Sequence, residues 1–110
     1  MDKLDELYVT LENACDKLQE YLNTYQYNGI GNFLIVRKAA LNEKLCALKI
    51  EVLRKETDNL TLIYEKASKL QEVAKKIICE IDHADNIFHN PAKIALHIDE
   101  VLSQINMLVK

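Results

Sequence analysis

The stretch RKETDNLTLIYEKASKL, residues 54–70, decides how this chain folds. Apolar residues at helical spacing lie on both sides of it, but the polar run ETDN, residues 56–59, separates them. Because Val52 and Leu60 are eight residues apart, Glu56 occupies the intervening position of the apolar seam. A continuous helix accommodates such an irregularity by local unwinding of its supercoil.

No strong helix breaker occurs in this stretch. Gly and Pro are absent from it, and Thr, Asp and Asn each cost a helix only about 0.5 kcal/mol relative to Ala. We therefore predict one long central helix, from about residue 33 to 88. The alternative is a break near residues 57–59, which would give a four-helix bundle.

The composition of the whole chain is typical of an all-α protein. Its 110 residues are 49% hydrophobic and include two Gly, one Pro and no Trp. Leu, Lys, Glu, Ile and Ala, most of which favour helices, are abundant, whereas the residues that build turns are scarce. We expect a single helical domain covering residues 1–110.

Four apolar seams, with spacings mostly of three and four residues, predict which side of each helix is buried. The first is Leu4, Leu7, Leu11, Ala14, Leu18, Tyr21 and Tyr25; the second is Leu34, Leu41, Leu45, Leu48 and Val52. The third is Leu60, Ile63, Ala67, Leu70, Ala74, Ile77, Ile81, Ala84 and Phe88; the last is Ile94, Ile98, Val101, Ile105 and Leu108.

Two short segments mark the ends of helices. NGIGN, residues 28–32, contains residues that tolerate a left-handed backbone, and Asn90 followed by Pro91 is a strong helix start. The prediction is therefore an antiparallel helical bundle or coiled coil. In it, an N-terminal helix (about 3–27) and a C-terminal helix (about 91–109) flank the central one.

The charge pattern predicts which helices are neighbours. Residues 1–32 contain six acidic and two basic residues, a net charge of −4, whereas residues 33–56 contain six basic and three acidic residues, a net charge of +3. Opposite charges favour these two segments as partners.

Several classes of function are disfavoured by composition. A net charge of −3 does not suit nucleic-acid binding, and no run of about 18 apolar residues is present to span a membrane. The three cysteines form no C-x-x-C pair, and the opening MDKLDELY does not resemble a secretory signal. We expect a cytoplasmic or nuclear protein.

No residue pattern indicates an enzyme, a cofactor or a metal. Cys79 and His83 share a helix face, as a nucleophile and a base would, but two groups on one turn do not make a site. Asp82, Asp85 and His89 lack a fourth ligand. We expect no catalytic, cofactor-binding or metal-binding residues and no small-molecule substrate.

The chain has more apolar surface than a two-helix seam can bury. LCALKIEVL, residues 45–53, is apolar at seven of nine positions, and residues 77–81 and 101–109 show a similar excess. The tip GIGNFLIV, residues 29–36, is interpreted as a turn that Ile30 and Leu34 close, or else as an exposed contact for a partner or a bilayer surface. The predicted partner-binding residues are Ile30, Phe33, Ile35, Cys46, Ile50, Leu53, Ile78, Leu102 and Val109.

These features predict a non-enzymatic coiled-coil subunit or adaptor of a larger oligomeric assembly. Its partner would be a protein, either another copy of the chain or a different helical subunit. The alternative is a self-contained four-helix bundle that binds a small ligand or a metal in its core.

Overall fold

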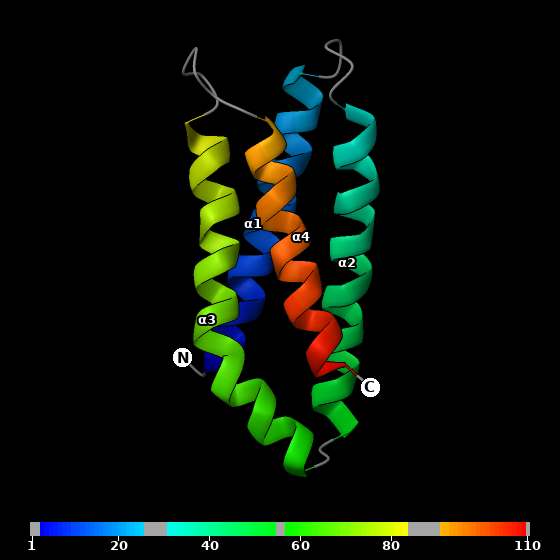
Figure 1. Cartoon of the computed structure of the whole chain (residues 1–110), viewed down its shortest axis with the longest axis vertical. Coiled ribbons are helices and arrows are strands. Elements are labelled where there is room, and N and C mark those ends of the chain that lie inside the picture. Colours follow the sequence, from blue (N-terminus) through cyan, green and yellow to red (C-terminus); the bar gives the residue numbers. More distant parts are fainter. Residues whose placement is uncertain (1–2, 26–30, 55–56, 84–90, 110) are drawn as a thin grey trace.

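The computed structural model describes residues 3–25, 31–54, 57–83 and 91–109. Four helices account for nearly all of them: α1 (Lys3–Tyr25), α2 (Gly31–Arg54), α3 (Thr57–Asp82) and α4 (Pro91–Leu108). They lie side by side as a compact bundle (Figure 1). The all-α prediction is confirmed, and α4 begins at Pro91 as expected.

The prediction of one helix from residue 33 to 88 is wrong, and the four-helix alternative is confirmed. α2 ends at Arg54, α3 begins at Thr57, and the two helices run in opposite directions (Figure 1). α3 ends at Asp82, and Phe88 lies outside the described residues.

Packing within the chain explains this reversal. Continuing the helix through residues 57–59 would have been only mildly unfavourable locally. Folding back instead puts the seams of α2 and α3 into one core, where each fully buried Leu or Ile contributes about 1.5–3 kcal/mol. No second chain has to be ordered to bury them, so the entropic cost of association is avoided.

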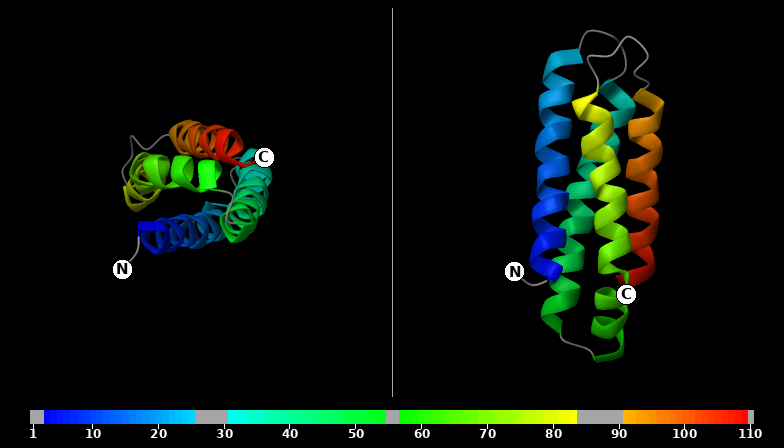
Figure 2. Two further views of the ribbon diagram at one scale, coloured as in Figure 1. Left: turned by 90° about the horizontal axis from the view of Figure 1, so that it is seen from below. Right: turned by 90° about the vertical axis from the view of Figure 1, so that its left-hand side faces the viewer.

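The helices are not arranged around the bundle in the order of the sequence. α1 contacts α2 and α3, and α4 contacts the same two helices, whereas α2 and α3 touch only slightly. Seen end-on, the ring order is α1, α2, α4, α3, so the connection from α2 to α3 crosses a diagonal (Figure 2). α1 and α3 run in one direction, and α2 and α4 run in the other (Figure 1).

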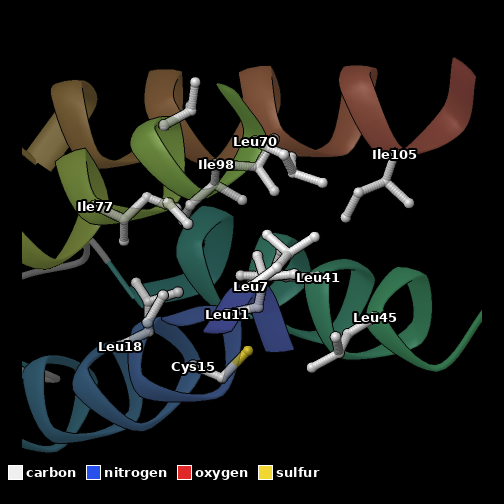
Figure 3. Packing of buried hydrophobic residues seen from close by; sticks show 14 of the residues in the cluster. Leu7, Leu11, Cys15, Leu18, Leu41, Leu45, Leu70, Ile77, Ile98 and Ile105 are labelled. Atoms are coloured by element: carbon white, nitrogen blue, oxygen red, sulfur yellow. The ribbon is translucent and has the colours of Figure 1, made fainter. Parts of the chain in front are cut away.

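The predicted seams form the core, which Figure 3 shows from close by. Every described seam residue is buried except Val52, Leu60 and Ile81, which are half-buried and pack against the core. The side chains of Tyr25, Ala84 and Phe88 lie outside the described part of the chain. The core also contains residues that the seams do not include: Cys15, Leu22, Val73 and Ala95.

Ion pairs join neighbouring helices at their edges. Lys49 Nζ lies 2.8 Å from Glu12 Oε1, which connects α2 to α1 and agrees with the predicted pairing of a basic and an acidic segment. Lys17 Nζ lies 2.6 Å from Asp82 Oδ1 on α3, and the hydrogen bond to that carboxylate raises the pKa of Lys17.

The dimensions fit a chain that closes its own core. The radius of gyration is 14.3 Å and the extents are 46 × 23 × 19 Å. The accessible surface is 6566 Å², close to the roughly 6,200 Å² expected for a folded monomer of this mass. None of the helices in the described ranges is long and apolar enough to cross a membrane.

Candidate functional site

The outer surface of α2 differs from that of the other three helices. Ten described residues of α2 are exposed, and only Asn42, Glu43 and Arg54 among them are polar. Leu53 is 73% exposed and Val36 is 69% exposed. The apolar members are Phe33, Ile35, Val36, Ala39, Cys46, Ile50 and Leu53.

Most of these apolar residues form one line along the helix. Successive positions in the set Ile35, Ala39, Cys46, Ile50 and Leu53 are four, seven, four and three residues apart, so the side chains lie on one side of α2. We call this set the outer stripe. At 1.5 Å per residue it extends about 27 Å along the helix.

The same helix has a second apolar side, which faces the core. Leu34, Leu41 and Leu48 are completely buried, and Leu45 is 6% exposed (Figure 3 labels Leu41 and Leu45). α2 is therefore apolar on both its inner and its outer side, as the composition of residues 45–53 suggests. Closing the bundle covers only one of the two.

Basic residues border the outer stripe on the side of α1. Lys49 forms its ion pair with Glu12 of α1, which defines this side. Lys38 precedes Lys49 by eleven residues, just over three full turns, so it lies on the same side. Its charge also acts on Cys15 of α1, where it partly offsets the burial that raises the pKa of this thiol to about 11.

Two more basic residues lie on the side of α2 that faces α4, away from the outer stripe. Arg37 Nε donates a hydrogen bond to Asp99 Oδ1 of α4 at 2.9 Å, and the Arg37 guanidinium lies 5.6 Å from the centre of the Phe33 ring. Lys44, seven residues further along, lies on this side as well. At 100° per residue, the exposed Val36 and Glu43 lie between these two bases and the outer stripe, so the stripe has a basic border only on the side of α1.

The structure brings some of the predicted partner-binding residues together and separates others. Ile35, Cys46, Ile50 and Leu53 lie on the outer stripe, whereas Phe33 is exposed beside Arg37 on the α4 side of the helix. Ile30 lies outside the described residues. Three others are half-buried and pack against the core from α3, from α4 and from the residue that follows α4; they are Ile78, Leu102 and Val109.

The predicted partner-binding residues omit two exposed apolar residues of α2, although Val36 belongs to the tip, residues 29–36, that is also a predicted contact. Ala39 belongs to the outer stripe, and Val36 lies on the outer side next to Ile35. The spacing of Ile35, Cys46 and Leu53 could have revealed Ala39, because it completes a line at helical intervals. A single alanine adds little to an apolar sequence pattern because its side chain is small.

Cys79 and His83 do not form an activated nucleophile and base. Their Sγ and Nδ1 atoms are 3.7 Å apart, but Nδ1 also lies 2.7 Å from the carbonyl oxygen of Cys79. A carbonyl can only accept a hydrogen bond, so Nδ1 must donate its proton there and cannot accept one from the thiol. Cys79 lies on the last turn of α3 and His83 directly follows this helix, and both side chains are exposed.

A shallow apolar groove lies between α3 and α4, away from α2. Its volume is about 230 Å³, and it is open to solvent along the surface. Its lining residues are Leu62, Lys66, Lys69, Gln104, Met107 and Leu108. It is a surface hollow, whereas the predicted alternative placed a ligand in the core of the bundle.

Among residues 3–25, 31–54, 57–83 and 91–109, no group of three His, Cys, Asp or Glu side chains could hold a metal ion. The outer stripe is therefore the feature of the surface that most requires an explanation. A comparison with protein-family models, with curated proteins and with solved structures finds no match.

Proposed function

We propose that this protein is a non-enzymatic helical adaptor, a subunit of a larger assembly that binds a partner protein along the outer stripe of α2. One observation supports this more than any other. Seven of the ten exposed, described residues of α2 are apolar, on a helix that already buries a full seam. A polar side chain at any of these exposed positions would change the stability of the fold very little, so the fold does not require apolar residues there.

The other helices show what an unused outer surface looks like in this fold. Exposed apolar residues scattered singly are normal on proteins, and Val9 on α1 and Leu96 on α4 are of this kind. The outer stripe instead runs along one side of a helix and is interrupted only at Asn42 and Glu43. Contiguous apolar surface bordered by polar residues is typical of an interface.

The geometry suits a helical partner. A straight apolar line with a charged border is what one helix presents to another in a coiled coil, where the central residues interdigitate and the border residues select the partner. Such a partner would lie along α2 without disturbing the core, because none of the stripe residues contributes to it.

The proposal includes a compartment. The three cysteines are free, and Cys46 is exposed at the centre of the proposed interface. An exposed thiol is best preserved where thiols are kept reduced. This supports the expected cytoplasmic or nuclear location, with protein rather than nucleic acid as the partner.

The test is the variant Ile50→Asp, with Leu96→Asp as its matched control. Ile50 is 54% exposed and Leu96 is 63% exposed, so both substitutions put the same charge at an accessible apolar position. We expect circular dichroism and thermal melting to show both variants folded. Capture from an extract of the source cells should yield a defined complex with the wild type and Leu96→Asp, and not with Ile50→Asp.

Thiol labelling of the captured complex adds a position-specific measurement. Cys46 should be protected within the complex, while Cys79 on α3 stays reactive. The proposal fails if Ile50→Asp assembles as well as Leu96→Asp, or if Cys46 remains as reactive in every captured complex as in the isolated chain.

A further inference from the structure

We propose that this protein also forms a domain-swapped dimer, in which two copies of the chain exchange their α3–α4 hairpins. The element that opens is the connection between α2 and α3. This inference goes beyond the proposed function and does not depend on it. It is carried by the crossed order of the helices, by the shortness of that connection and by its sequence.

The chain consists of two helical hairpins that complete each other's core. α1 and α2 form the first hairpin, and α3 and α4 form the second. The main contacts between the hairpins are those of α1 with α3 and of α2 with α4, whereas α2 and α3 touch only slightly. Opening the chain between α2 and α3 therefore breaks contacts that a second copy can restore in the same form.

The connection between the hairpins is short for the distance that it crosses. α2 ends at Arg54 and α3 begins at Thr57, so the chain makes three Cα–Cα steps, which reach about 11 Å at most. Neighbouring helix axes lie about 8–10 Å apart, so helices at opposite corners of a bundle have axes about 11–14 Å apart. α2 and α3 occupy opposite corners (Figure 2), and the first turns of α3 lean towards the end of α2 (Figure 1). Short connections under strain favour domain swapping.

The sequence across this connection is compatible with a continuous helix. Residues 54–60 contain neither Gly nor Pro, and Lys55 and Glu56 are good helix formers. The spacing between Val52 and Leu60 is one that an uninterrupted helix accommodates. In the exchanged form, α2 and α3 therefore join into one helix, about 78 Å long at 1.5 Å per residue. The single chain keeps its four-helix fold.

A two-fold axis through the opened connection generates the dimer. The joined helices of the two copies run antiparallel, so α3 of one copy runs opposite to α2 of the other, as these helices do within the single chain (Figure 1). Each end of the dimer is then a four-helix bundle with α1 and α2 from one copy and α3 and α4 from the other. The four seams pack as they do in the single chain, and the dimer carries two outer stripes.

The balance between the two forms is set by protein concentration and by the connection. The core contacts are the same in both forms, so the dimer gains no buried surface there and loses the translational freedom of one molecule. Closure of a short linker corresponds to an effective concentration in the millimolar range, so the exchange becomes significant at roughly millimolar protein. A more helical connection should favour the dimer, and a longer connection should favour the single chain.

Two ion pairs distinguish exchange from side-by-side association. Lys17 Nζ of α1 lies 2.6 Å from Asp82 Oδ1 of α3, so this pair joins the two hairpins. Lys49 Nζ of α2 lies 2.8 Å from Glu12 Oε1 of α1, so this pair lies within one hairpin. In the swapped dimer the first pair is formed between chains and the second within a chain. A carbodiimide joins an amine and a carboxylate in contact as an amide, so mass spectrometry can identify the chains that contribute to each pair.

The experiment uses an equal mixture of unlabelled and ¹⁵N-labelled full chain. The mixture is unfolded in urea with a reductant, refolded at roughly 1 mM protein, and separated by size with light-scattering detection. In the dimer fraction, about half of the Lys17–Asp82 cross-links should join a labelled chain to an unlabelled one. The Lys49–Glu12 cross-links should always lie within one chain.

Variants of the connection test the direction of the effect. Thr57→Ala combined with Asp58→Ala replaces two residue types that favour a helix start with the best helix former, and should lower the dimer dissociation constant about tenfold. The control combines Ser68→Ala with Ser103→Ala, which raise helix propensity equally in both forms at exposed positions of α3 and α4, and should leave the constant within about twofold. Insertion of Gly-Ser-Gly after Lys55 lengthens the connection and should remove the dimer.

Three outcomes would overturn the inference. The first is that the wild type and the variant with Thr57→Ala and Asp58→Ala both remain monomeric after refolding at high concentration. The second is a dimer in which every Lys17–Asp82 cross-link lies within one chain, which indicates side-by-side association. The third is an insertion variant that dimerises as strongly as the wild type. None of these outcomes affects the proposed function, which the capture experiment with Ile50→Asp tests separately.

Discussion

α1 and α2 have similar inner sides and opposite outer sides. Both are long helices with a regular leucine seam, and Leu7, Leu11 and Leu18 of α1 are buried as completely as Leu41 and Leu48 of α2. Outside, the described residues of α1 are almost entirely polar and largely acidic, whereas those of α2 are mostly apolar. The two helices thus contribute alike to the core but expose very different side chains to solvent.

This difference separates the residues that fold the protein from those that we propose give it a function. The core requires one apolar side per helix, and α1 shows that the other side can be almost entirely polar without loss of packing. The outer stripe of α2 therefore has no role in closing the bundle. Experiments that exchange the properties of these two helices test this separation.

The largest expected effect comes from placing a charge on the inner side of either helix. Leu48 and Leu11 are both completely buried, so Leu48→Asp and Leu11→Asp each remove a packed side chain and bury an unpaired carboxylate. Either cost, several kcal/mol, is comparable to the whole stability of a small domain. Circular dichroism should show loss of helix in both variants at room temperature. A folded Leu48→Asp variant would contradict the assignment of this side to the core.

The next largest effect comes from replacing exposed apolar residues of α2 with acidic residues, like those on the outer side of α1. The triple variant Ile35→Glu, Ile50→Glu and Leu53→Glu changes only exposed positions, each expected to alter the free energy of unfolding by no more than about 0.5 kcal/mol. The variant should melt within a few degrees of the wild type and fail to bind the partner. If it unfolds as Leu48→Asp does, the outer stripe contributes to the fold after all.

The rates at which the cysteines react with a thiol reagent distinguish the buried inner side of α1 from the exposed outer side of α2. Burial raises the pKa of Cys15 from 9.0 to about 11, so its thiolate fraction near pH 8 falls about a hundredfold, and the side chain is 6% exposed. Cys46 is exposed. Labelling of the native protein followed by mass spectrometry should modify Cys46 and Cys79 well before Cys15.

The shift of Cys15 also predicts a pH dependence. The folded state favours the neutral thiol, so this contribution to stability is complete below about pH 9 and is lost as the pH rises towards 11. The variant Cys15→Ala should lose less stability than the wild type over this range in chemical denaturation. An equal loss in both proteins would mean that the thiol does not titrate with unfolding.

The smallest expected effect concerns the ion pair that joins the two helices. Lys49 and Glu12 are 2.8 Å apart, but their side chains are 40% and 51% exposed. A double-mutant cycle with Lys49→Gln and Glu12→Gln should therefore give a coupling of only about 0.2–1 kcal/mol, smaller still in high salt. A coupling of several kcal/mol would show that charge, rather than the leucine seams, holds α1 against α2.

Local patterns were sufficient to predict the first and last helices and the buried side of each helix. The ends of α1 and α4 lie within two residues of the predicted ones, and every described residue of the first and last seams, as far as its side chain is described, is buried. These features depend on neighbours three and four residues apart, so the sequence contains them directly. The same periodicity revealed the excess of apolar residues between Leu45 and Leu53.

The sequence alone did not determine the reversal between α2 and α3 or the order of helices around the ring. Locally, a continuous helix and a break after Arg54 differ by only a few tenths of a kcal/mol per residue, so burial against distant helices decides between them. The arrangement of the four helices also determines which of the surplus apolar residues remain exposed to solvent. Ile78 and Leu102 pack against the core because α3 and α4 are neighbours there, whereas Ile50 lies on the side of α2 that none of the other described helices covers.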